Sequence, residues 1–231
     1  MNSLEIDGGY SLRGVINPQG AKNEALQVIC SVLLTNEKVE IENIPDILDV
    51  NKLINLLEIL GVKTKKIKQN TFSFQSDNIN LNKIKSDEFI KKATSLRGSV
   101  MIVGPLLTRF GKASIPRPGG DKIGRRRLDT HFDGLIKLGA KFNYNSDNYF
   151  YNVSSKKLKG NNILLEEASV TGTANILMAS VLASGKTELY NSACEPYIQQ
   201  LCLLLNKMGA KISGIGSNLL VVEGVNKLNG A

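Results

Sequence analysis

The sequence contains no tryptophan, and only 6% of its 231 residues are aromatic. Stacking platforms for single-stranded nucleic acids are therefore thinly supplied. No apolar run approaches the roughly 18 residues that a membrane-spanning helix needs. The first residues, MNSLEIDGGYSLRG, also lack the basic patch and apolar stretch of a secretory signal. We therefore expect a cytoplasmic protein without a membrane anchor.

Cysteine and histidine are also scarce. Three cysteines, Cys30, Cys194 and Cys202, show no metal-binding spacing, and an odd number of cysteines in a cytosolic protein does not suggest disulfides. Cys30 and Cys202 fall in apolar helical patterns and are predicted to be core thiols, whereas Cys194 lies at a turn and is expected to be more exposed. We predict no metal site.

Positive charge is in excess, with 29 basic and 21 acidic residues and a formal net charge of +8. Such a surplus suits an anionic partner, which is a nucleic acid, a membrane surface or a phosphorylated small molecule. Much of it is scattered, and the lysine run KTKKIK at 63–68 is predicted to be a solvated strand face. With 42% hydrophobic residues, the chain can bury a sizeable core.

Three similar tetrapeptides, LGVK at 60–63, LGAK at 138–141 and MGAK at 208–211, indicate an internal repeat. An amphipathic helical pattern precedes each one, and a pair of short strand patterns follows. The glycine within each tetrapeptide fits a helix C-terminus. The apolar stripes are Ile47, Val50, Leu53, Ile54, Leu57 and Leu60; then Phe132, Leu135, Ile136 and Leu138; then, after Pro196 in the first turn, Ile198, Leu201, Cys202, Leu205 and Met208.

Upstream of each amphipathic helix lies a segment rich in small residues and apolar on most faces, which predicts a buried helix. These segments read AKNEALQVICSVLL, SLRGSVMIVGPLLTRF and TGTANILMASVLASG, and a short strand pattern follows each. The sequence therefore predicts an α/β fold of three helix-strand-helix-strand-strand units, at about 21–80, 90–155 and 163–224. Residues 1–20 fall outside the pattern.

Lys22 and Asn23, in the motif GAKN at 20–23, open the first buried helix. Free backbone N–H groups, the helix dipole and the lysine charge together favour an anion site, although a solvated lysine at an ordinary helix start explains the same residues. Another motif, GKT at 185–187, resembles the end of a phosphate-binding P-loop. Ser180 stands where that loop needs glycine, so the motif is rejected.

A glycine-rich stretch, PGGDKIGRRRLD at 118–129, places Asp121 among three arginines just ahead of the second amphipathic helix. Arginine binds phosphate and carboxylate groups in bidentate fashion, so the stretch is a second candidate anion site; a solvated basic loop is the alternative. His131 is the only histidine. Its place in the helical pattern fits a buried, hydrogen-bonded side chain as well as a ligand or base.

The motifs GAKN, PGGDKIG with Arg126, Asp129 and His131 at set intervals, and TGTANILMAS at 171–180 resemble the UDP-N-acetylglucosamine enolpyruvyltransferase family over the whole chain. The resemblance implies an inside-out α/β barrel built of two similar domains, of which this chain would be the first, at 21–231. Residues 1–20 would form a strand segment that packs in the second domain, which is absent here.

The resemblance also implies a reaction: an enolpyruvyl group passes from phosphoenolpyruvate to the 3′-hydroxyl of UDP-N-acetylglucosamine and phosphate leaves. This cytoplasmic step opens peptidoglycan synthesis, which underlies the cell wall, cell shape and division, and it requires no redox or metal cofactor. The implied catalytic residues are Lys22, Arg126 and the proton donor Asp121. The implied substrate-binding residues are Lys22, Asn23, Arg97, Arg126, Arg127, Leu128, Asp129, Thr130, Ser169 and Val170.

The chain departs from the family pattern at two positions. Asp121 stands where most members carry cysteine, and Arg127 stands where they usually carry proline. The family's carboxylate base lies in the second domain, so we expect this chain to need that domain for turnover. Two alternatives remain: a relative that acts on shikimate phosphate, and a non-catalytic basic module that binds nucleic acid through Arg125 to Arg127.

Overall fold

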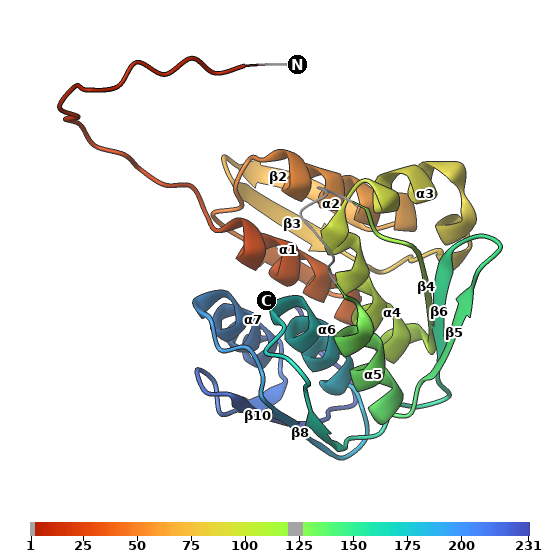
Figure 1. The fold of residues 1–231 in the computed structure, drawn as a ribbon. Helices are drawn as coiled ribbons and strands as arrows, with labels where there is room; N and C mark the ends of the chain where they lie inside the picture. The colour runs from red at the N-terminus through yellow and green to blue at the C-terminus, as the bar shows by residue number, and fades with distance from the viewer. Residues whose placement is uncertain (1–2, 120–126) are drawn as a thin grey trace.

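The computed structural model describes residues 3–119 and 127–231 and contains three small sheets arranged around a group of helices (Figure 1). The predicted unit of helix, strand, helix and two strands is present three times. The first unit comprises α1 (Lys22–Ser31), the 3₁₀ turn η1 (Val32–Leu34), β1 (Lys38–Ile41), α2 (Leu48–Leu60), β2 (Lys63–Lys68) and β3 (Thr71–Gln75).

The second unit confirms the predicted order of helix, strand, helix and two strands, but its first helix is divided, and two helical elements that the sequence pattern did not predict precede it. Its elements are η2 (Leu81–Lys85), α3 (Asp87–Thr94), η3 (Arg97–Ile102), α4 (Val103–Phe110), β4 (Lys112–Pro116), α5 (Asp129–Lys137), β5 (Lys141–Asn145) and β6 (Phe150–Ser154). The buried helix predicted across this stretch is divided into the 3₁₀ helix η3 and the α-helix α4. Pro105 explains the division, because its ring would collide with the carbonyl of Met101 in a continuous α-helix.

The third unit follows the prediction closely. It comprises β7 (Asn162–Leu164), α6 (Val170–Ser180), β8 (Lys186–Tyr190), α7 (Pro196–Lys207), β9 (Lys211–Ser213) and β10 (Leu219–Glu223). Pro196 occupies the first turn of α7, as expected for a residue that has no N–H to donate.

The three sheets share one antiparallel topology, in which the last strand of each unit lies in the middle. The strand orders are β1-β3-β2, β4-β6-β5 and β8-β10-β9, and β7 adds a parallel strand beside β8. The lysines of the repeated tetrapeptides take equivalent places. Lys63, Lys141 and Lys211 open the outer strands and pair with Gln75, Ser154 and Glu223 respectively, each the last residue of a central strand. The repeat in the sequence is therefore a repeat in strand register.

The buried helices lie inside the sheets, and glycine permits their close contact. A Cβ atom at Gly104 of α4 would stand 2.2 Å from the backbone oxygen of Asn175 in α6. A Cβ at Gly134 of α5 would stand 2.1 Å from the Cδ1 of Ile176, also in α6. A larger side chain at Gly104 would thus force α4 and α6 apart, whereas one at Gly134 would displace the Ile176 side chain. Residues 172–180 of α6 are all buried, as predicted for a central helix.

The outer helices bury the predicted stripes, except at Ile136. This residue is 44% exposed, because it lies about 100° around α5 from its buried neighbour Leu135. The three helix-terminal glycines Gly61, Gly139 and Gly209 have φ values of 105°, 93° and 103°, which confirms the predicted left-handed backbone.

Two sets of contacts join the later units to the first, one from the second unit and one from the end of the third. The guanidinium of Arg109, in α4, donates hydrogen bonds of 2.8–2.9 Å to the backbone oxygens of Leu33, Thr35 and Ser76. At the other end of the chain, the backbone of Ala231 pairs with β1 by accepting from the N–H of Glu40 and donating to the oxygen of Lys38.

The segment 3–19 contains no helix or strand and runs away from the body of the protein (Figure 1). Six of its apolar or aromatic residues are at least 78% exposed: Leu4, Ile6, Tyr10, Leu12, Val15 and Ile16. Its separation from the repeat agrees with the sequence pattern, and its packing in a second domain stays a prediction.

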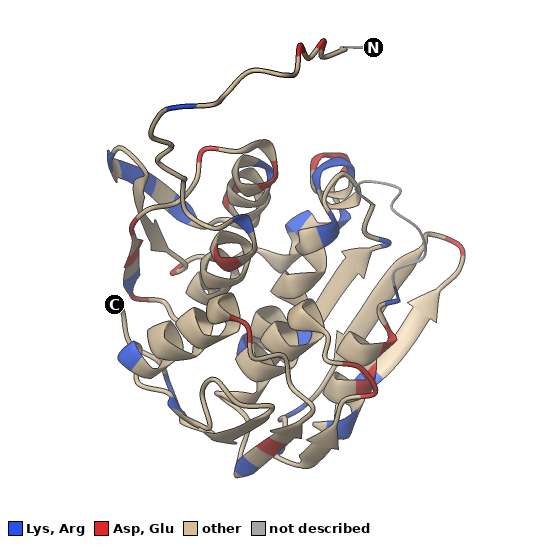
Figure 2. Ribbon diagram, turned by 60° about the vertical axis from the view of Figure 1, so that its left-hand side comes forward, with Lys and Arg blue, Asp and Glu red and all other residues tan. Residues whose placement is uncertain are grey.

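The remaining surface features follow the sequence. The lysine run forms the exposed strand β2, Cys30 and Cys202 are buried, and Cys194 is exposed. Lys and Arg occur on several helices and strands, with Asp and Glu among them (Figure 2). Within the described residues, no helix has the length and apolar character to cross a membrane. In the same part of the chain, no cluster of His, Cys, Asp or Glu could hold a metal ion.

Candidate active site

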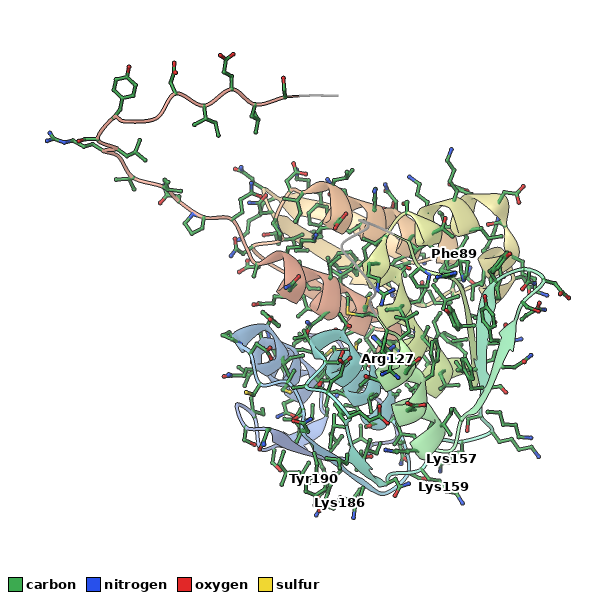
Figure 3. All side chains as sticks on the ribbon, viewed as in Figure 1. Phe89, Arg127, Lys157, Lys159, Lys186 and Tyr190 are labelled. Atoms are coloured by element: carbon green, nitrogen blue, oxygen red, sulfur yellow. The ribbon has the colours of Figure 1, made fainter. Side chains whose placement is uncertain are left out.

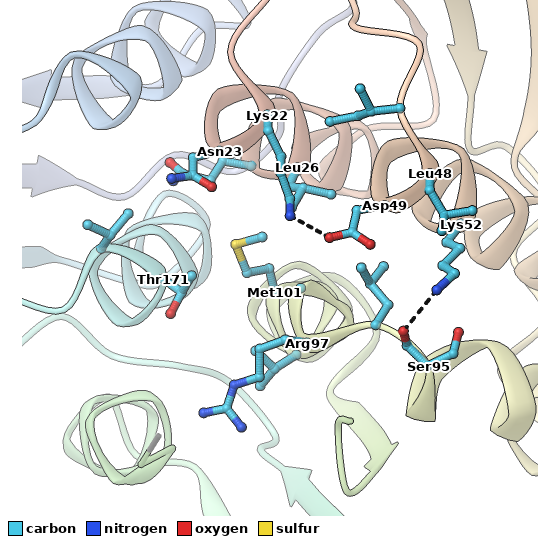
Figure 4. Close-up of a pocket in the computed structure, with 16 residues that line it drawn as sticks. Lys22, Asn23, Leu26, Leu48, Asp49, Lys52, Ser95, Arg97, Met101 and Thr171 are labelled. Carbon is cyan, nitrogen blue, oxygen red and sulfur yellow. Dashed lines mark hydrogen bonds and ion pairs between the residues drawn. The ribbon is translucent and has the colours of Figure 1, made fainter. Parts of the chain in front are cut away.

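A cleft of about 580 Å³ opens between α1, α2, η3 and the start of α6; we call it the Lys22 cleft (Figure 4). It is lined by Lys22, Asn23, Leu26, Gln27, Ile47, Leu48, Asp49, Lys52, Ser95, Leu96, Arg97, Gly98, Val100, Met101, Val170 and Thr171. Four predicted site residues, Lys22, Asn23, Arg97 and Val170, thus come together from three units of the chain. The cleft combines cationic side chains with an apolar floor.

Lys22 is the first residue of α1, where the preceding residue Ala21 is extended and offers no side-chain cap. The local sequence therefore leaves helix N–H groups to bind other acceptors, and the helix dipole favours negative charge. The Lys22 ammonium contacts the Asp49 carboxylate at 2.5 Å, and both side chains are partly exposed. A bound anion would compete with Asp49 for the lysine.

Arg97 begins η3, and its side chain reaches the cleft from the second unit (Figure 4). Its Nη2 donates a hydrogen bond of 3.1 Å to the backbone oxygen of Arg127. This contact places a cleft residue beside the end of the glycine-rich stretch. Asp121 and Arg126, the predicted proton donor and phosphate ligand, lie outside the described residues.

Residues 127–130 lie at the start of α5 and are not among the cleft-lining side chains. Arg127 pairs with Asp129 at 2.5 Å on the surface, and Leu128 is buried. The Thr130 hydroxyl donates to Glu167 at 3.2 Å, and Thr130 lines a separate cavity of about 330 Å³ beside β7. Figure 3 shows Arg127 near the central helices, whereas Lys157, Lys159 and Lys186 lie by β8.

The N-terminus of α6 forms one wall of the cleft. The Ser169 hydroxyl caps this helix by accepting from the N–H of Gly172 at 3.2 Å, so Ser169 has a local structural role. Val170 and Thr171 occupy the first two helical positions and line the cleft. The cap holds these two residues in place.

His131 is buried behind this wall and is hydrogen-bonded on both ring nitrogens. Its Nε2 lies 3.1 Å from Thr171 Oγ1, and its Nδ1 lies 3.0 Å from Asn175 Nδ2. The Asn175 amide also donates to the Val100 oxygen at 3.1 Å and accepts from the Gly104 N–H at 2.6 Å. Burial, together with the nearby Arg97 cation, lowers the pKa of His131 to about 3, so the ring is neutral near pH 7.

Sequence reasoning did not single out Asp49, Lys52 or Thr171. Asp49 and Lys52 lie on α2 at the border of its buried stripe, with intermediate exposure, and no local pattern links them to Lys22. Lys52 donates to the backbone oxygen of Ser95 at 3.3 Å across the cleft. Thr171 falls inside the motif TGTANILMAS, but nothing in that motif shows which threonine hydroxyl lines the cleft and which is buried in the core.

Comparison with known proteins identifies the family. The model of the EPSP synthase (3-phosphoshikimate 1-carboxyvinyltransferase) family matches residues 6–231. The chain belongs to this family. Because the match begins in the exposed N-terminal segment and runs to the last residue, it includes the Lys22 cleft and all three units.

Curated relatives within the EPSP synthase family carry a more specific name. UDP-N-acetylglucosamine 1-carboxyvinyltransferase from Bacteroides fragilis is 61% identical over 230 residues, which cover all of this chain and 53% of the relative. The proteins of that name from Porphyromonas gingivalis and Treponema pallidum are 60% and 42% identical over the same length. The chain spans about half the length of the curated relatives it matches.

Solved structures of two other proteins show the same fold. The enolpyruvyl transferase NikO from Streptomyces tendae superposes with a TM-score of 0.79 at 17% identity, over 96% of this chain and 51% of that protein. EPSP synthase from Acinetobacter baumannii gives a TM-score of 0.71 at 18% identity, over 94% of this chain and 48% of that protein. The predicted inside-out α/β barrel architecture is confirmed.

Proposed function

We propose that this chain contributes the first half of an enzyme that transfers an enolpyruvyl group from phosphoenolpyruvate to the 3′-hydroxyl of UDP-N-acetylglucosamine. The strongest support is the 61% identity, over the entire chain, to a relative with that name. The product would enter peptidoglycan synthesis in the cytoplasm, and through it support cell shape and division.

The chemistry requires three operations. A proton is added to the methylene carbon of phosphoenolpyruvate, and the sugar oxygen bonds to the adjacent carbon after losing its proton. Inorganic phosphate then leaves while the new methyl group gives up a proton, so that the double bond forms again. Cations must hold the phosphate and carboxylate groups throughout. Lys22 and Arg97 line one cleft and suit this task. We assign Asn23 to orienting the reactants.

The resemblance assigns proton donation to Asp121 and phosphate binding to Arg126. A carboxylate among arginines ordinarily has a lowered pKa. Proton donation by Asp121 therefore requires that desolvation and a bound dianion raise that pKa again. Residues 127–130, Ser169 and Val170 would contact the UDP-sugar. Arg127, in the usual place of proline, adds a cation at the start of α5.

The test joins this chain to the remaining half of the Bacteroides fragilis relative and measures phosphate release from phosphoenolpyruvate. We expect turnover with UDP-N-acetylglucosamine and none with 3-phosphoshikimate. The reverse preference would refute the proposal in favour of the shikimate alternative. The 231-residue chain alone should give no turnover, because we expect the other half of the relatives' length to complete the active site.

The nucleic-acid alternative predicts a different result. A basic module would bind RNA or DNA with an affinity that falls steeply as salt increases. We expect no such binding, since Arg127 is already paired with Asp129 and the chain has few aromatic residues. A filter-binding assay with single- and double-stranded probes measures this directly.

A further inference from the structure

Behind the Lys22 cleft, a series of hydrogen bonds links four residues and ends at a hydroxyl group whose role it determines. The series begins at the backbone of Gly104, whose N–H can only donate. It donates to Asn175 at 2.6 Å, so the accepting atom must be the carbonyl oxygen Oδ1 of that side chain. The amide orientation of Asn175 is therefore determined, and its Nδ2 carries the two hydrogens.

The orientation of Asn175 determines the tautomer of His131. One Nδ2 hydrogen goes to the Val100 carbonyl at 3.1 Å and the other faces His131 Nδ1 at 3.0 Å. Because Nδ2 is only a donor, Nδ1 must accept and cannot carry a proton. A neutral imidazole then has its single hydrogen on Nε2. His131 therefore donates to Thr171 Oγ1, 3.1 Å away.

The consequence falls on Thr171, whose side chain lines the same cleft as Lys22 and Arg97 (Figure 4). Its oxygen accepts a hydrogen bond from behind the wall, so its own hydrogen is available to a partner on the other side. A hydroxyl in water donates and accepts with equal ease. Here one of the two lone pairs of the oxygen already accepts from the buried His131, so the hydrogen of the hydroxyl points elsewhere and can reach a partner in the cleft.

We propose that the Thr171 hydroxyl donates a hydrogen bond to a phosphate or carboxylate oxygen of the ligand in the Lys22 cleft. His131 and Asn175 are positioning residues that orient this donor and do not touch the ligand. The inference rests on the proposed function, because it takes the ligand of the cleft to be one of the two anionic substrates. A ligand with only acceptor oxygens fits a site whose hydroxyl is held as a donor.

The test measures the affinity of the 231-residue chain for three probes: inorganic phosphate, phosphoenolpyruvate and UDP-N-acetylglucosamine. Comparing the three shows whether the bonded oxygen belongs to phosphoenolpyruvate or to the UDP-sugar. Thr171→Val should weaken the affected probe about tenfold or more, as expected for a lost hydrogen bond to a charged group. Thr171→Ser keeps the hydroxyl and should bind within about twofold of the unmodified chain.

Thr173 offers a matched control on the same helix. Its hydroxyl is buried and accepts from the N–H of Ala193 at 3.0 Å, away from the cleft lining. Thr173→Val removes the same atoms from α6 and should leave affinity for all three probes unchanged. If Thr171→Val binds every probe as tightly as the unmodified chain, the inference is wrong. Equal losses in Thr171→Val and Thr173→Val would overturn it too, since helix packing would then explain both.

The single histidine supplies a second readout that simple loss of packing would not reproduce. Nitrogen NMR of the imidazole reports one ring, without assignment ambiguity, because His131 is the only histidine. We expect the neutral form with its proton on Nε2, and a shift of that signal when the affected probe binds. The shift should persist in Thr171→Ser and vanish in Thr171→Val. A proton on Nδ1 would contradict the deduced bond directions.

The transfer assay separates the two proposals. Turnover with UDP-N-acetylglucosamine, together with unaltered affinity in Thr171→Val, would leave the proposed function intact and refute the role of Thr171. Anion binding that depends on the Thr171 hydroxyl, without any turnover in the joined enzyme, would refute the proposed reaction alone.

Discussion

Replacing Lys22 with alanine should separate binding from folding, and the structure allows both effects to be worked out. The Lys22 side chain is 48% exposed, and its ammonium contacts only one carboxylate among the described residues, that of Asp49. An exposed ion pair of this kind contributes about 0–1 kcal/mol to stability. A positive charge in the first turn of a helix also opposes the dipole by about 0.3–1 kcal/mol. The two terms offset each other, so Lys22→Ala should change the free energy of unfolding very little.

The effect on binding should be much larger. A lysine hydrogen bond to a bound phosphate or carboxylate contributes about 1.5–3 kcal/mol, which corresponds to roughly a 10- to 150-fold loss in affinity. The assay is the catalytic efficiency with phosphoenolpyruvate of the chain joined to the remaining half of the Bacteroides fragilis relative. Lys65→Ala, on the exposed strand β2, is the control and should have no effect.

Asp49→Asn provides the opposite test on the same contact. The Asp49 carboxylate competes with an anion for the Lys22 ammonium and repels that anion, so removal of the carboxylate charge should tighten phosphoenolpyruvate binding. An unchanged catalytic efficiency in Lys22→Ala would show that the lysine is merely solvated. A fall in thermal stability large enough to account for the lost activity would equally refute the reasoning.

Three further predictions follow from single residues. Arg109→Met leaves three backbone oxygens without their donor and should destabilise the fold by about 2–4 kcal/mol in urea unfolding; a change under 1 kcal/mol would contradict this. His131 has a pKa lowered to about 3 in the folded state against an ordinary 6.5. Between pH 6.5 and 3 the histidine is protonated in the unfolded chain but not in the folded one. The free energy of unfolding should therefore be independent of His131 above pH 6.5 and fall by about 1.4 kcal/mol per pH unit as pH falls toward 3. A His131→Asn variant with the same slope would disprove that origin. Asp121, a weak nucleophile, should leave the joined enzyme insensitive to the epoxide inhibitor fosfomycin, and Asp121→Cys should make it sensitive; time-dependent inactivation of the unmodified enzyme would argue otherwise.

The fold was predictable because its signals are local and repeated three times. Helical stripes, terminal glycines and paired strands each depend on residues within one unit, and Gly61, Gly139 and Gly209 marked the same point in all three. The exceptions are also informative. Pro105 divided a predicted helix, and the apolar residue Ile136 is exposed, because sequence spacing gives only an approximate angle around α5.

The cleft was only partly predictable, because it forms between units. Lys22 was proposed from its place at the start of a helix and Arg97 through the family resemblance, and their presence in one cleft agrees with both assignments. The contact of Lys22 with Asp49 and the bonds from Asn175 through His131 to Thr171 depend on helix packing across the centre. No spacing within the sequence encodes such contacts, since the residues concerned are 27 to 44 positions apart.

The pairing of Ala231 with β1 has a consequence for how this architecture can change in evolution. Open arrays of stacked repeats gain or lose units at their ends, because each unit touches only its neighbours. Here the tail of the third unit bonds to Lys38 and Glu40 of the first, so the series closes on itself. Insertion or deletion of a whole unit would break that junction and leave β1 with an unpaired edge. A change in the number of units would therefore require a new junction between the last unit and the first, which an open array does not need.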